Sequence, residues 1–298
     1  MRFEAYSILN LRLGVVVMVL PYFATVLVID SGIGGISIVK QIRALTDKIS
    51  TIYIADNAYF PYGNLPPELI LSRLETLIRT VQQNQHLDAV VIGCNTATVL
   101  MIDKLRQVFE TPFVGIVPAV KTAAQVSQNR KFTLLATDNT ARSAYINDLI
   151  AKFAKDCDVL RVSCVGLADI AEAKIYGTEA EQKAVEATFL GQDEQSLAHI
   201  KASDVILLGC THYAFLLPEL RRCFADHQQI IEPSLPVAKR LMWVLENQAT
   251  VKKELQISEQ EAPMEQHNRF YFTQSYESNA AFKWFLHSHG FETAEVLF

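Results

Sequence analysis

The chain has 298 residues, of which 50% are hydrophobic and 20% charged. This composition is ordinary for a globular α/β protein and leaves room for one large or two medium domains. A formal net charge of −5 argues against nucleic acid or an anionic membrane as the main partner. Five cysteines without a C-x-x-C spacing predict free thiols in a reducing compartment, and argue against a disulfide framework or a zinc knuckle.

The N-terminal region contains an uncharged run over residues 14–29 that superficially resembles a signal peptide. The run is short for a membrane-spanning helix and contains Pro21. Its last part, Val26–Ile29, leads directly into a turn motif, so removing the run would remove a strand. We therefore expect the first core strand there, and we interpret residues 1–25 as an extension, with Met18 as an alternative start.

The turn that follows reads DSGIGGISIVK from Asp30 onward. It matches neither G-x-x-x-x-G-K-[ST] nor G-x-G-x-x-G, so a nucleotide-binding loop is not indicated. The pattern predicts a tight turn that exposes the Asp30 carboxylate, the Ser31 hydroxyl and backbone N–H groups at a helix N-terminus. Such a turn can hold a carboxylate or another small anion. Glycines that serve only close packing of strand and helix are the alternative.

An aromatic loop follows the next strand, which we expect at Thr51–Ala55. The loop reads DNAYFPYGN over residues 56–64 and contains Pro61, which is typical of a wall or lid beside a binding site. Apolar residues at helical spacing then predict an amphipathic helix over residues 66–84.

The most informative feature is a unit that occurs twice. The segment DAVVIGC ends at Cys94, and DVILLGC ends at Cys210, at a constant offset of 116 residues from acid to cysteine. Each copy predicts a buried strand that delivers a cysteine to the turn before an amphipathic helix, where open α/β folds place their ligand sites. Two buried strands that are alike by chance, with cysteines as small core residues, are the alternative.

Alternating apolar and polar segments predict the remaining elements. Strands are expected at 112–117, 132–136, 159–163, 230–231 and 269–273, and helices at 141–155, 167–176, 178–201, 235–246 and 278–289. Residues 248–268 are polar and without periodicity, which predicts a surface loop.

This order predicts an α/β fold of two pseudo-symmetric parallel-sheet domains, with the active site in the cleft between them. We expect the first domain to comprise residues 26–117 plus 231–298, and the second to comprise residues 118–230.

The chemistry of such a site depends on Cys94 and Cys210, because both lie at predicted helix N-termini that favour a thiolate. Two thiols on opposing halves suit inversion of a carbon stereocentre, in which a base acts on one face and an acid on the other. The sulfurs would stand about 6–7 Å apart, each about 3–3.5 Å from the carbon. His212 follows Cys210 by two residues, so acyl transfer by that thiol alone is an alternative. Acyl transfer by Cys210 would leave Cys94 without a role.

Several motifs together resemble the cofactor-independent glutamate racemases of the aspartate/glutamate racemase superfamily, in family order from about residue 26 to residue 273. They are DSGIGG from Asp30, FPYG from Phe60, GCNTA from Gly93, VGIVP from Val114, LLAT from Leu134, DIAEAK from Asp169 and GCTHY from Gly209. The chain departs from the family pattern at Asn139, where Gly is frequent, and at Glu232-Pro-Ser234, where the family has Asp-Ser.

The resemblance implies that Cys94 and Cys210 are the two acid/bases, Cys94 for D-glutamate and Cys210 for L-glutamate. Asp30, Glu172 and His212 would support them. The substrate carboxylates and ammonium would be held at Asp30, Ser31, Tyr62, Gly63, Asn95, Thr96, Thr211 and His212. No cofactor and no metal are implied.

The resemblance also implies a bacterial cytoplasmic enzyme that supplies D-glutamate for peptidoglycan. The Ala173-Lys174 context and the extension resemble the subgroup activated by UDP-N-acetylmuramoyl-alanine, and a homodimer is compatible with the family. Three alternatives stay open at this point: an aspartate or hydantoin racemase on the same scaffold, a cysteine hydrolase, and a binding protein that retains the cleft.

Overall fold

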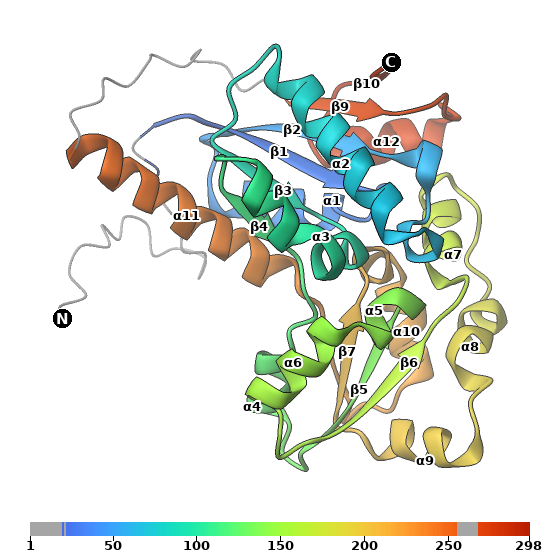
Figure 1. Ribbon diagram of the computed structural model, residues 1–298. Coiled ribbons are helices and arrows are strands. Elements are labelled where there is room, and N and C mark those ends of the chain that lie inside the picture. Colours follow the sequence, from blue (N-terminus) through green and yellow to red (C-terminus); the bar gives the residue numbers. More distant parts are fainter. Residues whose placement is uncertain (1–19, 21, 255–267) are drawn as a thin grey trace, which may run out of the picture.

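The computed structural model describes residues 20, 22–254 and 268–298, with the backbone alone over 249–254. Two separate parallel sheets organise the chain, and Figure 1 shows them in two bodies joined beside helix α11 (Ser234–Glu254). The prediction of an α/β fold with two parallel sheets is confirmed.

Within the described residues, the first sheet has six strands in the order β10-β9-β2-β1-β3-β4, all parallel. Their bounds are β1 (Ala24–Asp30), β2 (Ile49–Ala55), β3 (Ala89–Ile92), β4 (Phe113–Gly115), β9 (Arg269–Phe272) and β10 (Ala294–Val296). Helices α1 (Ile36–Leu45), α11 and α12 (Ala280–Ser288) pack on one face, and α2 (Pro67–Gln82) and α3 (Asn95–Val108) on the other.

The second sheet has four described strands in the order β6-β5-β7-β8, again parallel. The strands are β5 (Lys131–Ala136), β6 (Asp158–Ser163), β7 (Val205–Gly209) and β8 (Gln229–Ile231). One face is covered by α4 (Val120–Val126), α5 (Asp138–Arg142) and α6 (Ala144–Phe153). The other is covered by α7 (Leu167–Ile175), α8 (Gln182–Leu190), α9 (Glu194–Ala202), the 3₁₀ helix η3 (Thr211–Leu216) and α10 (Leu217–Cys223).

The apolar runs of the sequence become strands because both faces of each sheet are buried. In β1, Val26 and Val28 pack into the core beneath α1 and α11, whereas Leu27 and Ile29 pack into the core beneath α2 and α3. All four side chains have 0% exposure. A strand buried on both sides has no polar face, so its sequence reads as a continuous apolar run.

Several expected elements differ in detail. The helix expected over 141–155 is interrupted at Ser143, whose hydroxyl caps the new helix by accepting from the N–H of Ile146. The helix expected over 178–201 is likewise two helices, and Asp193 caps the second. The backbone of α11 continues to Glu254, so the surface loop predicted from residue 248 was wrong over 248–254; residues 255–267 lie outside the described part.

The expected division into domains stays a prediction, and two strands cross its boundaries. β1 begins at Ala24, inside the range interpreted as an extension, and β8 ends at Ile231 in the second sheet. No described helix is long and apolar enough to cross a membrane.

Candidate active site

The reactive side chains lie where parallel strands end. Asp30 is the last residue of β1, Cys94 follows β3, and Cys210 follows β7 in the other sheet. A small cavity with a volume of about 20 Å³ lies between these strand ends. It is lined by Ser31, Phe60, Pro61, Gly63, Cys94, Asn95, Thr96, Thr137, Ala168, Cys210, Thr211 and His212. Both sheets therefore contribute residues to one site, and both thiols line it.

Hydrogen bonds connect the two bodies around this cavity. Thr211 Oγ1 donates to Asp30 Oδ2 at 2.9 Å, and the N–H of Ile33 donates to Glu172 Oε2 at 3.2 Å. The hydroxyl oxygens of Thr96 and Thr137 are 3.0 Å apart. The Asp30 turn therefore contacts α7 and η3, which cover the second sheet.

Cys210 begins a chain of polar contacts through the second body. Its Sγ is 3.9 Å from His212 Nδ1, and His212 Nε2 is 2.7 Å from Glu172 Oε2. Burial alone would lower the pKa of His212, but its hydrogen bonds to Cys210 and Glu172 outweigh burial and raise the pKa well above its ordinary value. The raised pKa favours a protonated imidazole, and this ring lies beside the sulfur of Cys210.

Cys94 is in a different electrostatic setting. Burial raises the pKa of its thiol, and the nearby Asp30 carboxylate raises it further. The N–H of Ala97 and the hydroxyl of Ser31 act in the opposite direction and do not compensate. Burial also raises the pKa of Asp30, which His212 opposes. The proton consequently stays on Cys94.

Asn95 is the clearest indication of a ligand. Its side chain lines the cavity and is 2% exposed, yet neither its Oδ1 nor its Nδ2 has a hydrogen-bond partner. A buried amide without partners costs free energy unless something bonds to it. The amide can donate to a carboxylate and accept from an ammonium group, which fits an amino acid.

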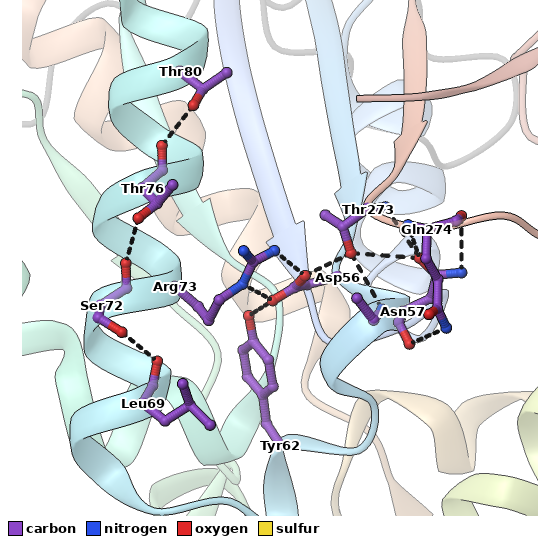
Figure 2. Close-up of polar contacts among 11 residues, drawn as sticks. Asp56, Asn57, Tyr62, Leu69, Ser72, Arg73, Thr76, Thr80, Thr273 and Gln274 are labelled. Atoms are coloured by element: carbon purple, nitrogen blue, oxygen red, sulfur yellow. Dashed lines mark hydrogen bonds and ion pairs between the residues drawn. The ribbon is translucent and has the colours of Figure 1, made fainter. Parts of the chain in front are cut away.

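The aromatic loop forms one wall of the cavity, and a buried carboxylate anchors it. The loop contains the short 3₁₀ helices η1 (Asn57–Tyr59) and η2 (Tyr62–Asn64). Figure 2 shows Asp56 accepting bonds from the Tyr62 hydroxyl at 2.6 Å, from Arg73 of α2, and from the Thr273 hydroxyl after β9. Asp56 is 0% exposed, so this network fixes where the loop presents Gly63 to the cavity.

The sequence-predicted site residues fall into three groups. Ser31, Gly63, Cys94, Asn95, Thr96, Cys210, Thr211 and His212 line the cavity. Asp30 and Glu172 lie behind that wall, bonded to Thr211 and His212. Tyr62 does not line the cavity, and its side-chain hydroxyl donates to Asp56.

Phe60 and Pro61 of the loop predicted as a wall or lid line the cavity, whereas the sequence analysis gave no role to Thr137 or Ala168, which line it too. Thr137 could have been found from its position, since it follows β5 at the same edge of the sheet as Cys210. The helix expected after Cys210 begins as η3, a 3₁₀ helix, and continues as the α-helix α10. Among the described residues, no cluster of His, Cys, Asp or Glu is arranged to hold a metal ion.

Two thiols that line one buried cavity from opposite sheets define an arrangement suited to a two-base isomerase. Comparison with known proteins identifies the family. Residues 26–239 match the family described as Asp/Glu/Hydantoin racemase. The glutamate racemase of Haemophilus influenzae (strain 86-028NP) is 36% identical, over 92% of this chain and 96% of its own. The chain belongs to the Asp/Glu/Hydantoin racemase family.

Solved structures agree with this assignment. The crystal structure of Escherichia coli glutamate racemase in complex with L-glutamate and the activator UDP-MurNAc-ala has a TM-score of 0.78. It is 31% identical, and the match covers 92% of this chain and 98% of that one. A Bacillus anthracis glutamate racemase isoform, 24% identical over 91% of this chain and 96% of its own, shares the fold with a TM-score of 0.71.

Proposed function

We propose that this protein interconverts L- and D-glutamate, with Cys94 and Cys210 as the two bases. The observation that carries the proposal is the pair of thiols that line one cavity from opposite sheets, in opposite electrostatic settings. Curated relatives that span nearly the whole chain are glutamate racemases, which favours glutamate over aspartate or hydantoin as substrate.

In the L-to-D direction, the Cys210 thiolate removes the α-proton. The C–H bond breaks, an S–H bond forms, and the electron pair moves into the α-carboxylate. Cys94 then donates its thiol proton to the opposite face of the carbon, which leaves Cys94 as the thiolate and Cys210 as the thiol. In this second step the S–H bond of Cys94 breaks and a C–H bond forms with the electron pair returned from the carboxylate. The D-to-L direction uses the same steps with the roles exchanged.

The supporting residues act on charge and position. His212, protonated and held by Glu172, stabilises the Cys210 thiolate before proton transfer. Donors at Ser31, Asn95, Thr96 and Thr211 hold the carboxylates, where negative charge accumulates during the reaction. Asp30, Tyr62 and Gly63 complete the site, and Asp30 orients Thr211 by accepting a hydrogen bond from its hydroxyl.

Substrate entry requires the two bodies to separate. A volume of about 20 Å³ suffices for roughly one water molecule and not for glutamate. The bonds from Thr211 to Asp30 and from Ile33 to Glu172 cross the cleft, so they must break on opening. Closure around glutamate would then exclude water and bring both thiols to the same carbon.

The direct test is a coupled or polarimetric assay of the purified protein with D- and L-glutamate and no added cofactor. The proposal requires racemisation in both directions with equal kcat/KM, because the two enantiomers are equally stable. A substrate panel with aspartate and hydantoins distinguishes the alternative racemases. A cysteine hydrolase would retain its activity in Cys94→Ala, whereas a racemase would not.

We expect activity without pyridoxal phosphate or metal, because two thiols and a protonated imidazole supply the acid/base groups. Protein dialysed against a chelator and a carbonyl-trapping reagent should keep its full kcat. A loss of activity that added metal or pyridoxal phosphate restores would contradict this expectation.

We also expect residues 1–17 to be dispensable for catalysis. They lie outside the described residues, whereas Leu20 is fully buried in the first core and β1 begins at Ala24. A shortened protein that begins at Met18 keeps Leu20 and β1, and it should racemise glutamate as the full chain does. A folded but inactive shortened protein would show that the extension is functional.

The wider role follows from the same proposal: a bacterial cytoplasmic enzyme that supplies D-glutamate for peptidoglycan. We propose that UDP-N-acetylmuramoyl-alanine activates it, as the E. coli structure was determined with that activator. Assays of the full chain and of the Met18 form, with and without this precursor, test activation and any role of the extension. Light scattering tests the proposed homodimer.

A further inference from the structure

An ion pair connects α7, the helix whose Glu172 contacts His212, to α10, the helix that follows η3. Lys174 Nζ lies 2.8 Å from both carboxylate oxygens of Glu219 and donates to the carbonyl of Phe215 at 3.0 Å. Lys174 lies on α7, Phe215 on η3 and Glu219 on α10. None of the three lines the cavity.

The burial of Glu219 distinguishes this pair from an ordinary surface pair. Its side chain is 9% exposed and that of Lys174 is 30% exposed. Arg222 also approaches Glu219, at 3.6 Å, but 62% of its side chain is exposed. Lys174 is therefore the main partner of a nearly buried carboxylate. Removing one partner of such a pair costs far more than an exposed pair contributes.

The position of Lys174 in the sequence gives the pair its significance. Lys174 follows Glu172 by two residues, so one short helix holds His212 through Glu172 and holds Phe215 and Glu219 through Lys174. His212 and Phe215 both belong to η3, which begins directly after Cys210. Hydrogen-bond geometry in a 3₁₀ helix is poorer than in an α-helix, so η3 depends on such outside contacts for its position.

We propose that Lys174 and Glu219 are positioning residues that keep η3 against α7, so that His212 stays between Glu172 and Cys210. They act through η3 and touch neither substrate nor thiol. The inference rests on the proposed function only where it treats Cys210 as a base.

The test compares two substitutions of Lys174 with a control substitution of another lysine. Lys174→Met removes the ammonium and keeps the chain length, and Lys174→Arg keeps the charge. Lys131→Met is the matched control, because Lys131 forms an ion pair with Asp158 at 3.0 Å and has a similarly exposed side chain, 35%. Lys131 belongs to β5 and does not line the cavity.

We expect Lys174→Met to lower kcat by about 10- to 100-fold, the scale of a displacement near 1 Å of a catalytic group. KM should change much less, because Ser31 and Asn95 belong to the other body and keep their positions. Lys174→Arg should recover most of the lost kcat, and Lys131→Met should match the parent protein. An unchanged kcat in Lys174→Met, or an equal loss in Lys131→Met, would overturn the proposal.

Hydrogen exchange measures the same contact without any assay of activity. Amides of residues 211–216 should exchange faster in Lys174→Met, whereas those of 95–108 should exchange as in the parent. If the parent protein does not racemise glutamate, the proposed function fails, and exchange still decides whether the pair holds η3. Unchanged exchange over 211–216 would overturn the proposal.

A second variant guards against misfolding of the first. Glu219→Gln keeps the side-chain shape and removes the charge. If the pair acts as one unit, the double variant Lys174→Met/Glu219→Gln should have a kcat no lower than that of the less active single variant. Losses that multiply would show that the two residues act independently and would contradict a shared role.

Discussion

Serine at position 94 or at position 210 is expected to remove nearly all racemisation of glutamate. A hydroxyl is a far weaker acid than a thiol, and racemisation requires proton transfer on both faces of the carbon. Loss of one acid/base group typically costs about 10²–10⁴-fold in rate. We therefore expect kcat of Cys94→Ser and of Cys210→Ser to fall by at least about 10²-fold, measured in both directions.

A matched control separates loss of chemistry from loss of structure, since both thiols are buried. Cys164 is also buried, at 2% exposure, but does not line the cavity. Cys164→Ser should destabilise the fold about as much as the other two substitutions, as judged by thermal unfolding, and should keep its kcat. Activity lost equally in all three variants would attribute the effect to packing.

The second large effect on activity is expected from Gly34→Ala, which adds one methyl group. A Cβ at position 34 would lie 2.5 Å from His212 Nδ1 and 2.6 Å from Thr211 Oγ1, distances that real Cβ atoms do not show. Gly34→Ala must therefore displace the side chains of His212 and Thr211, or the turn that carries residue 34. Since about 1 Å of misplacement can cost about 10²-fold, we expect kcat/KM to fall by about that factor.

The control for this substitution is Gly191→Ala, which adds the same methyl group in open space. Its Cβ would come no closer than 3.7 Å, to the carbonyl of Ala187. Unfolding of Gly34→Ala should remain cooperative, because the collision is local to the cleft. Parent-like kinetics in Gly34→Ala would show that His212 does not need its present position.

The sequence predicted the parts of this site that depend on local pattern. The repeated strand-Gly-Cys unit identified both thiols, because a strand buried on both faces has a continuous apolar sequence that ends at a turn. The Asp30 turn was predicted for the same reason. The fold class followed from the alternation of strands and helices, which forces parallel pairing through crossover helices.

What the sequence could not provide depends on packing between distant segments. The bond between Thr96 and Thr137, and the pair of Lys174 and Glu219, join residues more than 40 positions apart. The bond from the Tyr62 hydroxyl to the buried Asp56 could not be read from the sequence either, and the predicted contact of Tyr62 with substrate stays a prediction. Strand β10 has only three residues, two of them exposed, so it carries no apolar signal.

The most direct test of the two-base proposal separates the two faces of the substrate. In D₂O, folded Cys94→Ser retains Cys210 and should exchange the α-hydrogen of L-glutamate faster than that of D-glutamate. Cys210→Ser retains Cys94 and should show the opposite preference. Proton NMR of each enantiomer with each variant measures the four rates. Opposite preferences are the predicted result; the same preference in both variants, or full racemisation by either, would contradict the proposal that each thiol serves one face.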